Sequence, residues 1–126
     1  MRLMSFSITT DQARNRTKTV TRRNGWANAQ VGDILQQVEK AMGLKAGEKV
    51  VRIHTIKITN VCREPLRRMV DDAWYGRHEV ILEGFPLSTP QEFVDLYCRA
   101  NKCKPDTIVT RIEFEGVLRA RGKTQE

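Results

Sequence analysis

The stretch Thr17-Lys18-Thr19-Val20-Thr21-Arg22-Arg23 places three hydroxyl groups and three cations around a single apolar side chain. A half-buried strand normally alternates apolar and polar residues, and this stretch does not. Hydroxyl groups and cations together suit a surface that contacts phosphate groups or a polar nucleobase. The stretch is therefore the first candidate for a functional surface, and the fold is built outward from it.

The positive charge of the chain gathers around this stretch. Residues 1–26 hold six lysines and arginines against one acidic residue, Asp11, while the formal net charge of all 126 residues is +7. The sequence pI is near 9.7. Cations concentrated in this way favour an anionic partner, which is a nucleic acid or an anionic membrane.

Length and composition indicate one ordinary globular domain. The chain has 126 residues, of which 40% are hydrophobic and 29% charged. No apolar run approaches the roughly 20 residues of a spanning helix, and Ser5 and Ser7 break the apolar stretch after Arg2 too early for a secretory signal. We expect a cytoplasmic protein with no membrane partner; the oligomeric state is not predicted.

The cysteines give no sign of a metal site. Cys62, Cys98 and Cys103 are odd in number and lack the C-x-x-C spacing, and neither His54 nor His78 stands at ligand spacing from a cysteine. Structural zinc normally takes four such ligands. We expect reduced thiols, no metal and no cofactor.

The first half of the chain predicts short strands around one helical turn. Residues 3–8 have the composition of a strand, and threonines precede a helical turn over residues 11–13. The stretch 17–23 is expected to form the next strand. A further strand over residues 34–39 leads through glycines and lysines into an exposed hairpin loop over residues 40–49.

The run 50–61 is the longest β-rich segment of the chain. Its apolar alternation changes phase, because Val51 and Ile53 share one face while Ile56 and Ile58 fall on the other. One extra residue in a strand produces such a change. We therefore expect a bulge near residues 54–55.

Helical signals dominate the second half. Residues 63–75 are expected to form helical turns and loop, with Pro65 near a helix start, and residues 72–82 a short helix. The clearest helix begins at Thr89, where Thr89-Pro90-Gln91-Glu92 combines a capping box with proline at the first helical position. Its apolar stripe predicts a face that packs on a core, formed by Phe93, Leu96, Tyr97 and Ala100.

A final strand over residues 107–117 completes the pattern, with Ile108, Ile112 and Phe114 on one face. About five or six unequally spaced strands and two or three short helices indicate an α+β domain or a small mixed β-barrel. The domain is expected to cover residues 1–117, and residues 118–126 to form a mobile tail.

Lys18, Thr21 and Glu83 are the candidate catalytic residues. A threonine hydroxyl becomes a nucleophile when a base takes its proton. A lysine serves as that base when burial or neighbouring cations destabilise its ammonium form. A carboxylate such as Glu83 can then move a proton to a leaving group or bind the exocyclic amine of a base.

Structural interpretations of the same residues remain open. A strand rich in lysine, threonine and arginine is often a solvated sheet edge, and Glu83 before Gly84 has the pattern of a helix end with its glycine cap. In a flat strand Lys18 and Thr21 would point to opposite faces. They converge only if the strand bulges or ends there.

At these residues the chain resembles the ASCH family, small domains related to the PUA RNA-binding fold. The match starts from Lys18-x-x-Thr21-x-Arg23 and extends over about residues 3–117. Its further motifs are Val31-Gly32-Asp33-Ile34-Leu35, Glu83-Gly84-Phe85 and Val109-Thr110-Arg111-Ile112-Glu113-Phe114. The resemblance implies a small PUA-like mixed β-barrel with a cleft lined by the lysine motif.

The resemblance also implies functions, since ASCH members are linked to RNA binding, to ribonuclease activity and to hydrolysis of acetylcytidine. In the amidohydrolase members the working residues are a lysine, a threonine and a glutamate, which fall on Lys18, Thr21 and Glu83. One departure is that Arg16 stands where the family usually has glycine. Arginine there is expected to narrow the cleft or to add a phosphate contact.

Two hypotheses follow, with RNA or a modified nucleoside as the partner in both. The first is a hydrolase acting on a modified cytidine or on RNA. The second is a binding module, or a ribonuclease using the same basic cleft, in which cations hold phosphates and an aromatic ring stacks a base. The residues proposed for these contacts are Arg16, Arg22, Arg23 and Trp26. A domain that binds another protein is a third interpretation.

Overall fold

The computed structural model describes residues 1–117. The predicted mobile tail, residues 118–126, lies outside the described residues. Within them the chain forms five strands and four helices, in the order β1 (Arg2–Ser5), α1 (Thr10–Arg14), β2 (Val20–Arg23), β3 (Ile34–Val38), β4 (Arg52–Pro65), α2 (Arg68–Asp71), α3 (Ala73–Leu82), α4 (Pro90–Asn101) and β5 (Ile108–Gly116).

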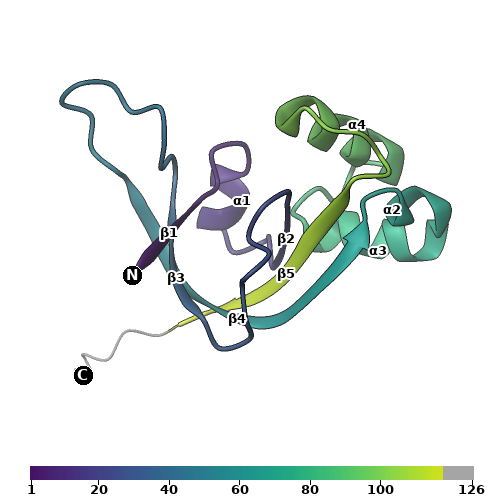
Figure 1. The fold of residues 1–126 in the computed structure, drawn as a ribbon, viewed down its shortest axis with the longest axis horizontal. Helices are drawn as coiled ribbons and strands as arrows, with labels where there is room; N and C mark the ends of the chain where they lie inside the picture. The colour runs from purple at the N-terminus through teal and green to yellow at the C-terminus, as the bar shows by residue number, and fades with distance from the viewer. Residues whose placement is uncertain (118–126) are drawn as a thin grey trace.

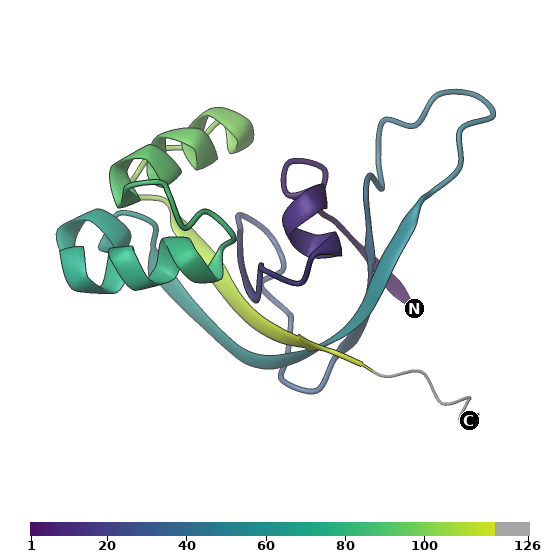
Figure 2. The same ribbon diagram turned by 180° about the vertical axis from the view of Figure 1, so that it is seen from behind.

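The five strands make one mixed sheet in the order β1-β3-β4-β5-β2. β1 pairs with β3 in parallel, and every other pair is antiparallel. The sheet curls into an open half-barrel with α1 in its hollow, while α2, α3 and α4 gather at one end (Figure 1). Figure 2 shows the same arrangement from behind. The predicted α+β class with a small PUA-like barrel is confirmed.

The bulge predicted in the long strand is confirmed. Gln36 pairs with Thr55 and Val38 with Arg52, so β4 carries one residue more than β3 between these two pairs. The pairing of β4 with β5 contains a second register shift, which lies between Ile58 and Asn60 of β4. Bulges increase the local bend of a strand, and β4 curves around the half-barrel at these places (Figure 1).

Two apolar clusters fill the molecule. One lies within the curl of the sheet and comprises Met4, Phe6, Ala13, Leu35, Ile56, Ile58, Ile112 and Phe114. The other lies under the helices and comprises Leu66, Met69, Val80, Phe93, Val94, Tyr97 and Val109. Burial of these side chains is the main favourable term that holds the helices against the end of the sheet.

The helices follow their local signals. Thr89 Oγ1 accepts a hydrogen bond from the backbone N–H of Glu92 at 3.1 Å, and Glu92 Oε1 accepts one from Thr89 N at 2.8 Å, which confirms the capping box of α4. At α1, Thr9 makes no side-chain cap, and the Thr10 hydroxyl instead donates to the carbonyl of Phe6 at 2.8 Å. None of these helices has the length and apolar character needed to cross a bilayer.

Several predicted boundaries are wrong. β1 ends at Ser5, so Ile8 is 59% exposed rather than part of a strand. Residues 63–65 end β4 instead of beginning a helix. In β5, Ile108 is exposed while Val109 is buried. β5 starts beneath the helices, and their contact decides which side chains are covered there.

Candidate functional site

Lys18 lies before β2, not within it. Its backbone N–H donates to Gln12 O of α1 at 3.3 Å, and the next N–H, of Thr19, donates to Leu82 O at the end of α3 at 2.8 Å. Because β2 begins only at Val20, strand alternation does not force Lys18 and Thr21 onto opposite faces. Both side chains line one pocket. The predicted strand over residues 17–23 is therefore too long, and its late start removes the geometric obstacle.

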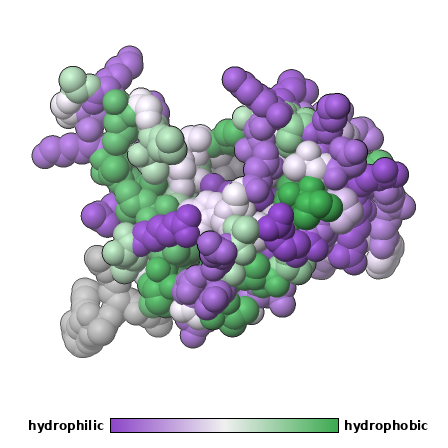
Figure 3. Space-filling view, in the orientation of Figure 1, coloured by the Kyte–Doolittle hydropathy of each residue, from purple (hydrophilic) through white to green (hydrophobic). Residues whose placement is uncertain are grey.

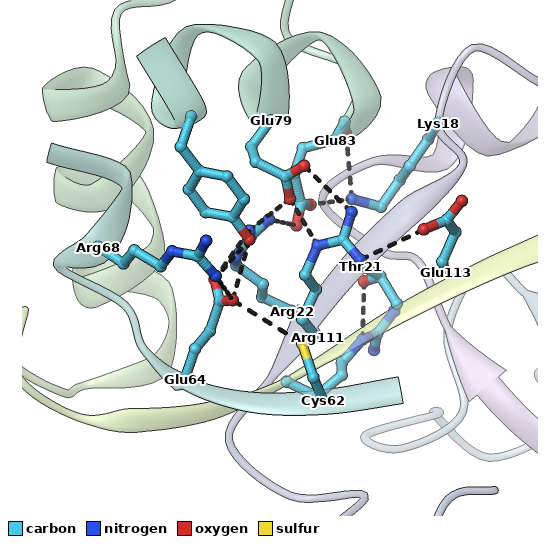
Figure 4. Close-up of polar contacts among 12 residues, drawn as sticks. Lys18, Thr21, Arg22, Cys62, Glu64, Arg68, Glu79, Glu83, Arg111 and Glu113 are labelled. Atoms are coloured by element: carbon cyan, nitrogen blue, oxygen red, sulfur yellow. Dashed lines mark hydrogen bonds and ion pairs between the residues drawn. The ribbon is translucent and has the colours of Figure 1, made fainter. Parts of the chain in front are cut away.

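Lys18 and Glu83 form a buried ion pair. Lys18 Nζ donates to Glu83 Oε1 at 2.5 Å and to the Glu83 carbonyl at 3.1 Å, and both side chains are at most 3% exposed. Figure 4 shows the Lys18 ammonium group pointing toward the carboxylate of Glu83 at the end of α3. Burial lowers the pKa of Lys18 below its ordinary value, although the charge of Glu83 and its hydrogen bond act in the opposite direction.

Glu83 both caps the end of a helix and belongs to this site. It is the C-cap of α3, and Gly84 follows with a φ of +95°. Gly84 N donates to Ile81 O at 3.0 Å and Phe85 N to Val80 O at 2.8 Å, which closes the helix end. The two alternatives that the sequence left open for Glu83 are thus compatible. The glycine turn fixes the direction in which the carboxylate leaves the helix.

Replacing Gly84 with alanine is expected to destabilise the protein by about 2–3 kcal/mol. A Cβ there would lie 2.8 Å from Gln12 Cγ and 3.3 Å from Lys18 Cβ, in a conformation that glycine adopts freely. Gly32→Ala is the matched control, because Gly32 has a φ of +97° with nothing within 4 Å. It should cost only about 1 kcal/mol. Urea unfolding measures both, and equal losses would contradict the close packing of Gly84 on Lys18.

Arg22 is the centre of a buried charge network. Its Nη1 donates to Glu83 Oε2 at 2.9 Å, and its Nη2 donates to Glu79 Oε1 at 2.5 Å and to Glu64 Oε2 at 3.1 Å. The Arg22 side chain has no solvent exposure. This geometry corrects the predicted phosphate contact of Arg22, because its terminal nitrogens are already committed to carboxylates. Arg22 instead holds Glu83 so that the other oxygen faces Lys18.

Glu79, Arg111 and Tyr75 extend this network, and sequence reasoning did not identify them as site residues. Arg111 Nε donates to Glu79 Oε1 at 2.6 Å, and Tyr75 OH lies 2.9 Å from Glu64 Oε1. Burial alone would raise the pKa of Glu79, but Arg111 and Arg22 together keep it below its ordinary value. The one available signal is that Glu79 and Glu83 are four residues apart on α3, on one helix face.

A pocket of about 250 Å³ opens above the ion pair. Its lining comes from residues 5–9 on one side and from α4 on the other, and Figure 3 shows the surface hollowed beside α4. Its polar wall includes Lys18, Thr21, Arg23 and Glu83, and its apolar wall includes Phe6, Phe85, Phe93, Leu96 and Tyr97. The stripe of α4 thus lines the pocket as well as the core: Phe93 and Tyr97 are buried, whereas Leu96 is half-buried and Ala100 exposed.

Arg23 connects the polar and apolar walls. Its Nε donates to Thr21 Oγ1 at 3.0 Å, and its guanidinium lies 4.8 Å from the centre of the Phe6 ring. Burial lowers the pKa of Arg23 to about 10, with Glu83 opposing that effect, so the group stays cationic at neutral pH. Within residues 1–117 Arg23 forms no ion pair with a carboxylate, and Thr21 forms no hydrogen bond to Lys18 or Glu83.

Arg16 and Trp26 do not line the 250 Å³ pocket, although Arg16 lines a smaller hollow of about 80 Å³ together with Lys18. Arg16 Nη2 is 3.3 Å from His54 Nδ1, and the backbone of Arg16 has a φ of +60°. Trp26 is half-buried, with the guanidinium of Arg2 over its ring at 3.7 Å. The guanidinium of Arg2 thus covers one face of the Trp26 ring on which a base was predicted to stack, and Arg16 does not line the larger pocket.

No family model matches the chain, and no curated protein matches it. Solved structures do. The hypothetical protein PH0355 shares 13% identity, a TM-score of 0.58, and coverage of 92% of this chain and 96% of its own. Protein EF3133 from Enterococcus faecalis V583, of family DUF984, shares 14% identity and a TM-score of 0.58, with coverage of 93% and 76%.

A third structure carries the family name. The ASCH domain from Lactobacillus crispatus JV V101 shares 15% identity and a TM-score of 0.50, with coverage of 91% of this chain and 78% of that domain. The chain has the ASCH fold. The resemblance found in the sequence is therefore confirmed at the level of the fold. At identities of 13–15% the roles of residues in this ASCH-fold protein rest on its own geometry.

The structure gives a physical reason why glycine suits the position that Arg16 occupies. In this ASCH-fold chain the position is Arg16, whose φ of +60° lies in the left-handed region. Glycine adopts that region at no steric cost, whereas other residues lose about 1 kcal/mol or more. The backbone turn that leads into Lys18 therefore has a conformation that suits glycine, and in this chain an arginine adopts it.

Proposed function

We propose that this ASCH-fold protein binds the base of a modified cytidine in the Lys18 pocket and hydrolyses an acyl amide on it. The observation that supports this most directly is the buried Lys18–Glu83 pair at 2.5 Å, which shares the pocket with the hydroxyl of Thr21. A lysine, a threonine and a glutamate are the working residues of the amidohydrolases that the sequence resembles.

Lys18 is suited to act as the base. Burial lowers its pKa, which increases the fraction of neutral amine near neutral pH. A neutral amine can take a proton from a hydroxyl group, whereas an ammonium group cannot. The Glu83 carboxylate holds the amine in place and receives the proton later in the cycle.

Thr21 is suited to act as the nucleophile. Its oxygen accepts a hydrogen bond from Arg23 Nε at 3.0 Å, so the hydroxyl proton remains available for donation. The neighbouring guanidinium charge also stabilises a developing alkoxide. If Thr21 positions a water instead, that water attacks the acyl carbon directly and the same base takes its proton.

The bond changes follow from these positions. The Thr21 oxygen bonds to the acyl carbon as its proton moves to Lys18, and the amide C–N bond breaks as the leaving nitrogen takes a proton from the Lys18–Glu83 pair. Water then cleaves the acyl-threonine ester, which releases a carboxylic acid and regenerates the hydroxyl. The products are the free amine of cytidine and the acid.

The pocket walls favour a planar base over a flexible acyl chain. Of the phenylalanines that line the pocket, Phe85 is half-buried and offers a partly open ring, whereas Phe6 and Phe93 line it from the core. A base stacks on an open aromatic ring with about 1–3 kcal/mol. Glu83 on the polar wall can bind an exocyclic amine. A cytosine ring between these walls would present its amine to Lys18, Thr21 and Glu83 together.

A non-catalytic RNA-binding domain is the second candidate, with a ribonuclease using the same cleft as its catalytic variant. Arg23 favours this candidate, because it is a cation in the pocket wall without a carboxylate partner among residues 1–117. The net charge of +7 also favours a polyanion. Binding of this kind weakens steeply with salt, because counterions are released from the phosphates.

A panel of acylated cytidines and RNA separates these candidates. Purified wild-type protein and Lys18→Ala are incubated with acetylcytidine, other acylated nucleosides, and single-stranded or structured RNA. If the protein is a hydrolase, the wild type converts acetylcytidine to cytidine and acetate, and Lys18→Ala does not. RNA binding without turnover supports the second candidate. If no nucleoside is converted and Lys18→Ala binds RNA as tightly as wild type, both fail.

The rate of hydrolysis is expected to rise with pH. Lys18 acts as a base only when neutral, and its pKa is lowered from 10.5 by burial, so kcat/KM should climb through the lowered pKa and level off above it. An unperturbed lysine would level off only near 10.4. The pH profile of kcat/KM measures this directly. A rate that falls as pH rises toward 9 would contradict a base role for Lys18.

A further inference from the structure

A second hollow of about 230 Å³ lies where the residues after α1 meet β3 and β4, and it shares no lining residue with the 250 Å³ pocket. A smaller hollow of about 80 Å³ is lined by Arg16 and His54 and also by Lys18. The polar lining of the second hollow comes from Arg16, Gln36, Arg52, His54 and Thr55, with no aspartate or glutamate. Both arginines are exposed, and neither forms an ion pair within residues 1–117. The second hollow is therefore lined by two arginines without an ion-pair partner among residues 1–117, although Glu115 lines the adjacent smaller hollow together with Arg16.

The backbone of Arg16 gives an independent reason to assign a role to this hollow. Arg16 has a φ of +60°, in the left-handed region that glycine adopts freely and that is unfavourable for an arginine. Strain of this kind persists where the surrounding structure or a function requires the side chain. Gly116 leaves space for it, because a Cβ on Gly116 would lie 2.5 Å from Arg16 Nη1.

His54 orients the guanidinium of Arg16. His54 Nε2 lies 3.0 Å from the carbonyl oxygen of Arg14, which can only accept, so Nε2 carries the proton and Nδ1 presents a lone pair. Arg16 Nη2 donates to that lone pair at 3.3 Å. One corner of the guanidinium is thereby fixed, and its remaining N–H groups are left for an acceptor in the hollow.

We propose that Arg16 and Arg52 form a phosphate-binding site, and that its ligand is a phosphodiester group of RNA. A planar guanidinium held at one corner suits bidentate contact with phosphate oxygens. Arg16 stands two residues before Lys18, which places their Cα atoms within about 7 Å. This inference rests on the proposed function, because it makes the substrate a modified cytidine within RNA instead of a free nucleoside.

Histidine NMR tests the site with inorganic phosphate alone. The chain has two histidines, and His78 is exposed on α3, where it serves as an internal reference. Phosphate is added at constant pH and ionic strength. We expect the ring signals of His54 to shift and saturate while those of His78 stay, and Arg16→Gly to abolish the shift. Equal shifts of both histidines, or a His54 shift that survives Arg16→Gly, would overturn the site.

A second arm separates RNA from free phosphate. We compare wild type with the double variant Arg16→Gly/Arg52→Gln. Affinity is measured for an oligoribonucleotide that contains one acetylcytidine and for free acetylcytidine. Arg67→Gln is the control, since it removes an exposed arginine that precedes α2 and pairs with Asp71. We expect the double variant to bind the oligonucleotide about tenfold more weakly, with a salt slope lower by about 1, and the nucleoside as before.

The two proposals fail separately in this design. If the double variant has the same oligonucleotide affinity and the same salt slope as Arg67→Gln, the RNA assignment is overturned. This holds even if phosphate alone shifts the His54 signals. Failure of wild type to bind either the nucleoside or the oligonucleotide would overturn the proposed function and this inference together. If the wild type binds the nucleoside tightly and the double variant loses no affinity for the oligonucleotide, this inference alone is overturned.

Discussion

Replacing Thr21 with valine is expected to lower kcat for acetylcytidine by about a thousandfold or more, because valine removes the attacking oxygen and keeps the side-chain shape. Thr21 is 3% exposed, so the change also leaves Arg23 Nε without its acceptor. That loss should cost about 1–2 kcal/mol of stability. Single-turnover hydrolysis and urea unfolding measure the two effects on the same protein.

Two further substitutions make this result specific. Thr21→Ser keeps a hydroxyl and should retain measurable turnover. Thr19→Val removes an exposed hydroxyl two residues away and should leave kcat within about twofold of wild type, since surface changes of this kind are usually small. A Thr21→Val protein that hydrolyses acetylcytidine at the wild-type rate would exclude a catalytic role for the Thr21 oxygen.

Glu79→Gln is expected to lower the free energy of unfolding by about 3–5 kcal/mol, the cost of removing one partner from a buried ion pair. Glu79 is 2% exposed and accepts hydrogen bonds from both Arg22 and Arg111. Glutamine preserves the size of the side chain but leaves both guanidinium groups without this carboxylate. Urea unfolding at neutral pH measures the loss.

Glu113→Gln is the matched control for Glu79→Gln. Glu113 also contacts Arg111, at 3.3 Å, but its side chain is 45% exposed, and exposed pairs contribute about 0–1 kcal/mol. Equal losses in the two variants would contradict the buried network. The pKa of Glu79 is lowered in the folded protein, so its contribution is present above the unfolded value near 4.3. The difference between wild type and Glu79→Gln should vanish as pH falls through the folded pKa.

The elements that could be predicted from the sequence are those with local causes. The α4 start at Thr89 and Pro90 depends on residues within one helical turn, and the bulge of β4 depends on alternation within one strand. Glu83 and Gly84 were recognisable as a helix end by their neighbours. Each of these signals is contained in a few consecutive residues, so tertiary packing did not change it.

The features that could not be predicted depend on contacts between distant segments. Lys18 leaves the strand because Gln12 O takes its N–H and Leu82 O takes that of Thr19, which no local pattern records. Arg22 is committed to Glu64 and Glu79, 42 and 57 residues away. From the local sequence, an arginine beside a threonine motif is expected to contact phosphate. The carboxylates that Arg22 contacts instead are distant in the sequence and are identified only by the structure.

The Arg16 position combines both kinds of information. Its departure from the family's glycine is visible in the sequence, and the resemblance indicated a changed cleft. In the structure the side chain of Arg16 contacts His54 and lines the second hollow, and it also lines a smaller hollow together with Lys18. The backbone turn belongs to the fold, whereas the direction of the side chain had to come from its tertiary partners.

A crystal structure with cytidine, the product of the proposed reaction, tests most directly whether the Lys18 pocket is a base-binding hydrolytic site. The expected density places the cytosine ring against the phenylalanines of the pocket. Its exocyclic amine should lie within about 2.6–3.2 Å of Glu83 or Lys18, or one bridging water away, and near Thr21 Oγ1. Cytidine bound elsewhere, or bound here with its amine turned away from these three residues, would contradict the proposed function.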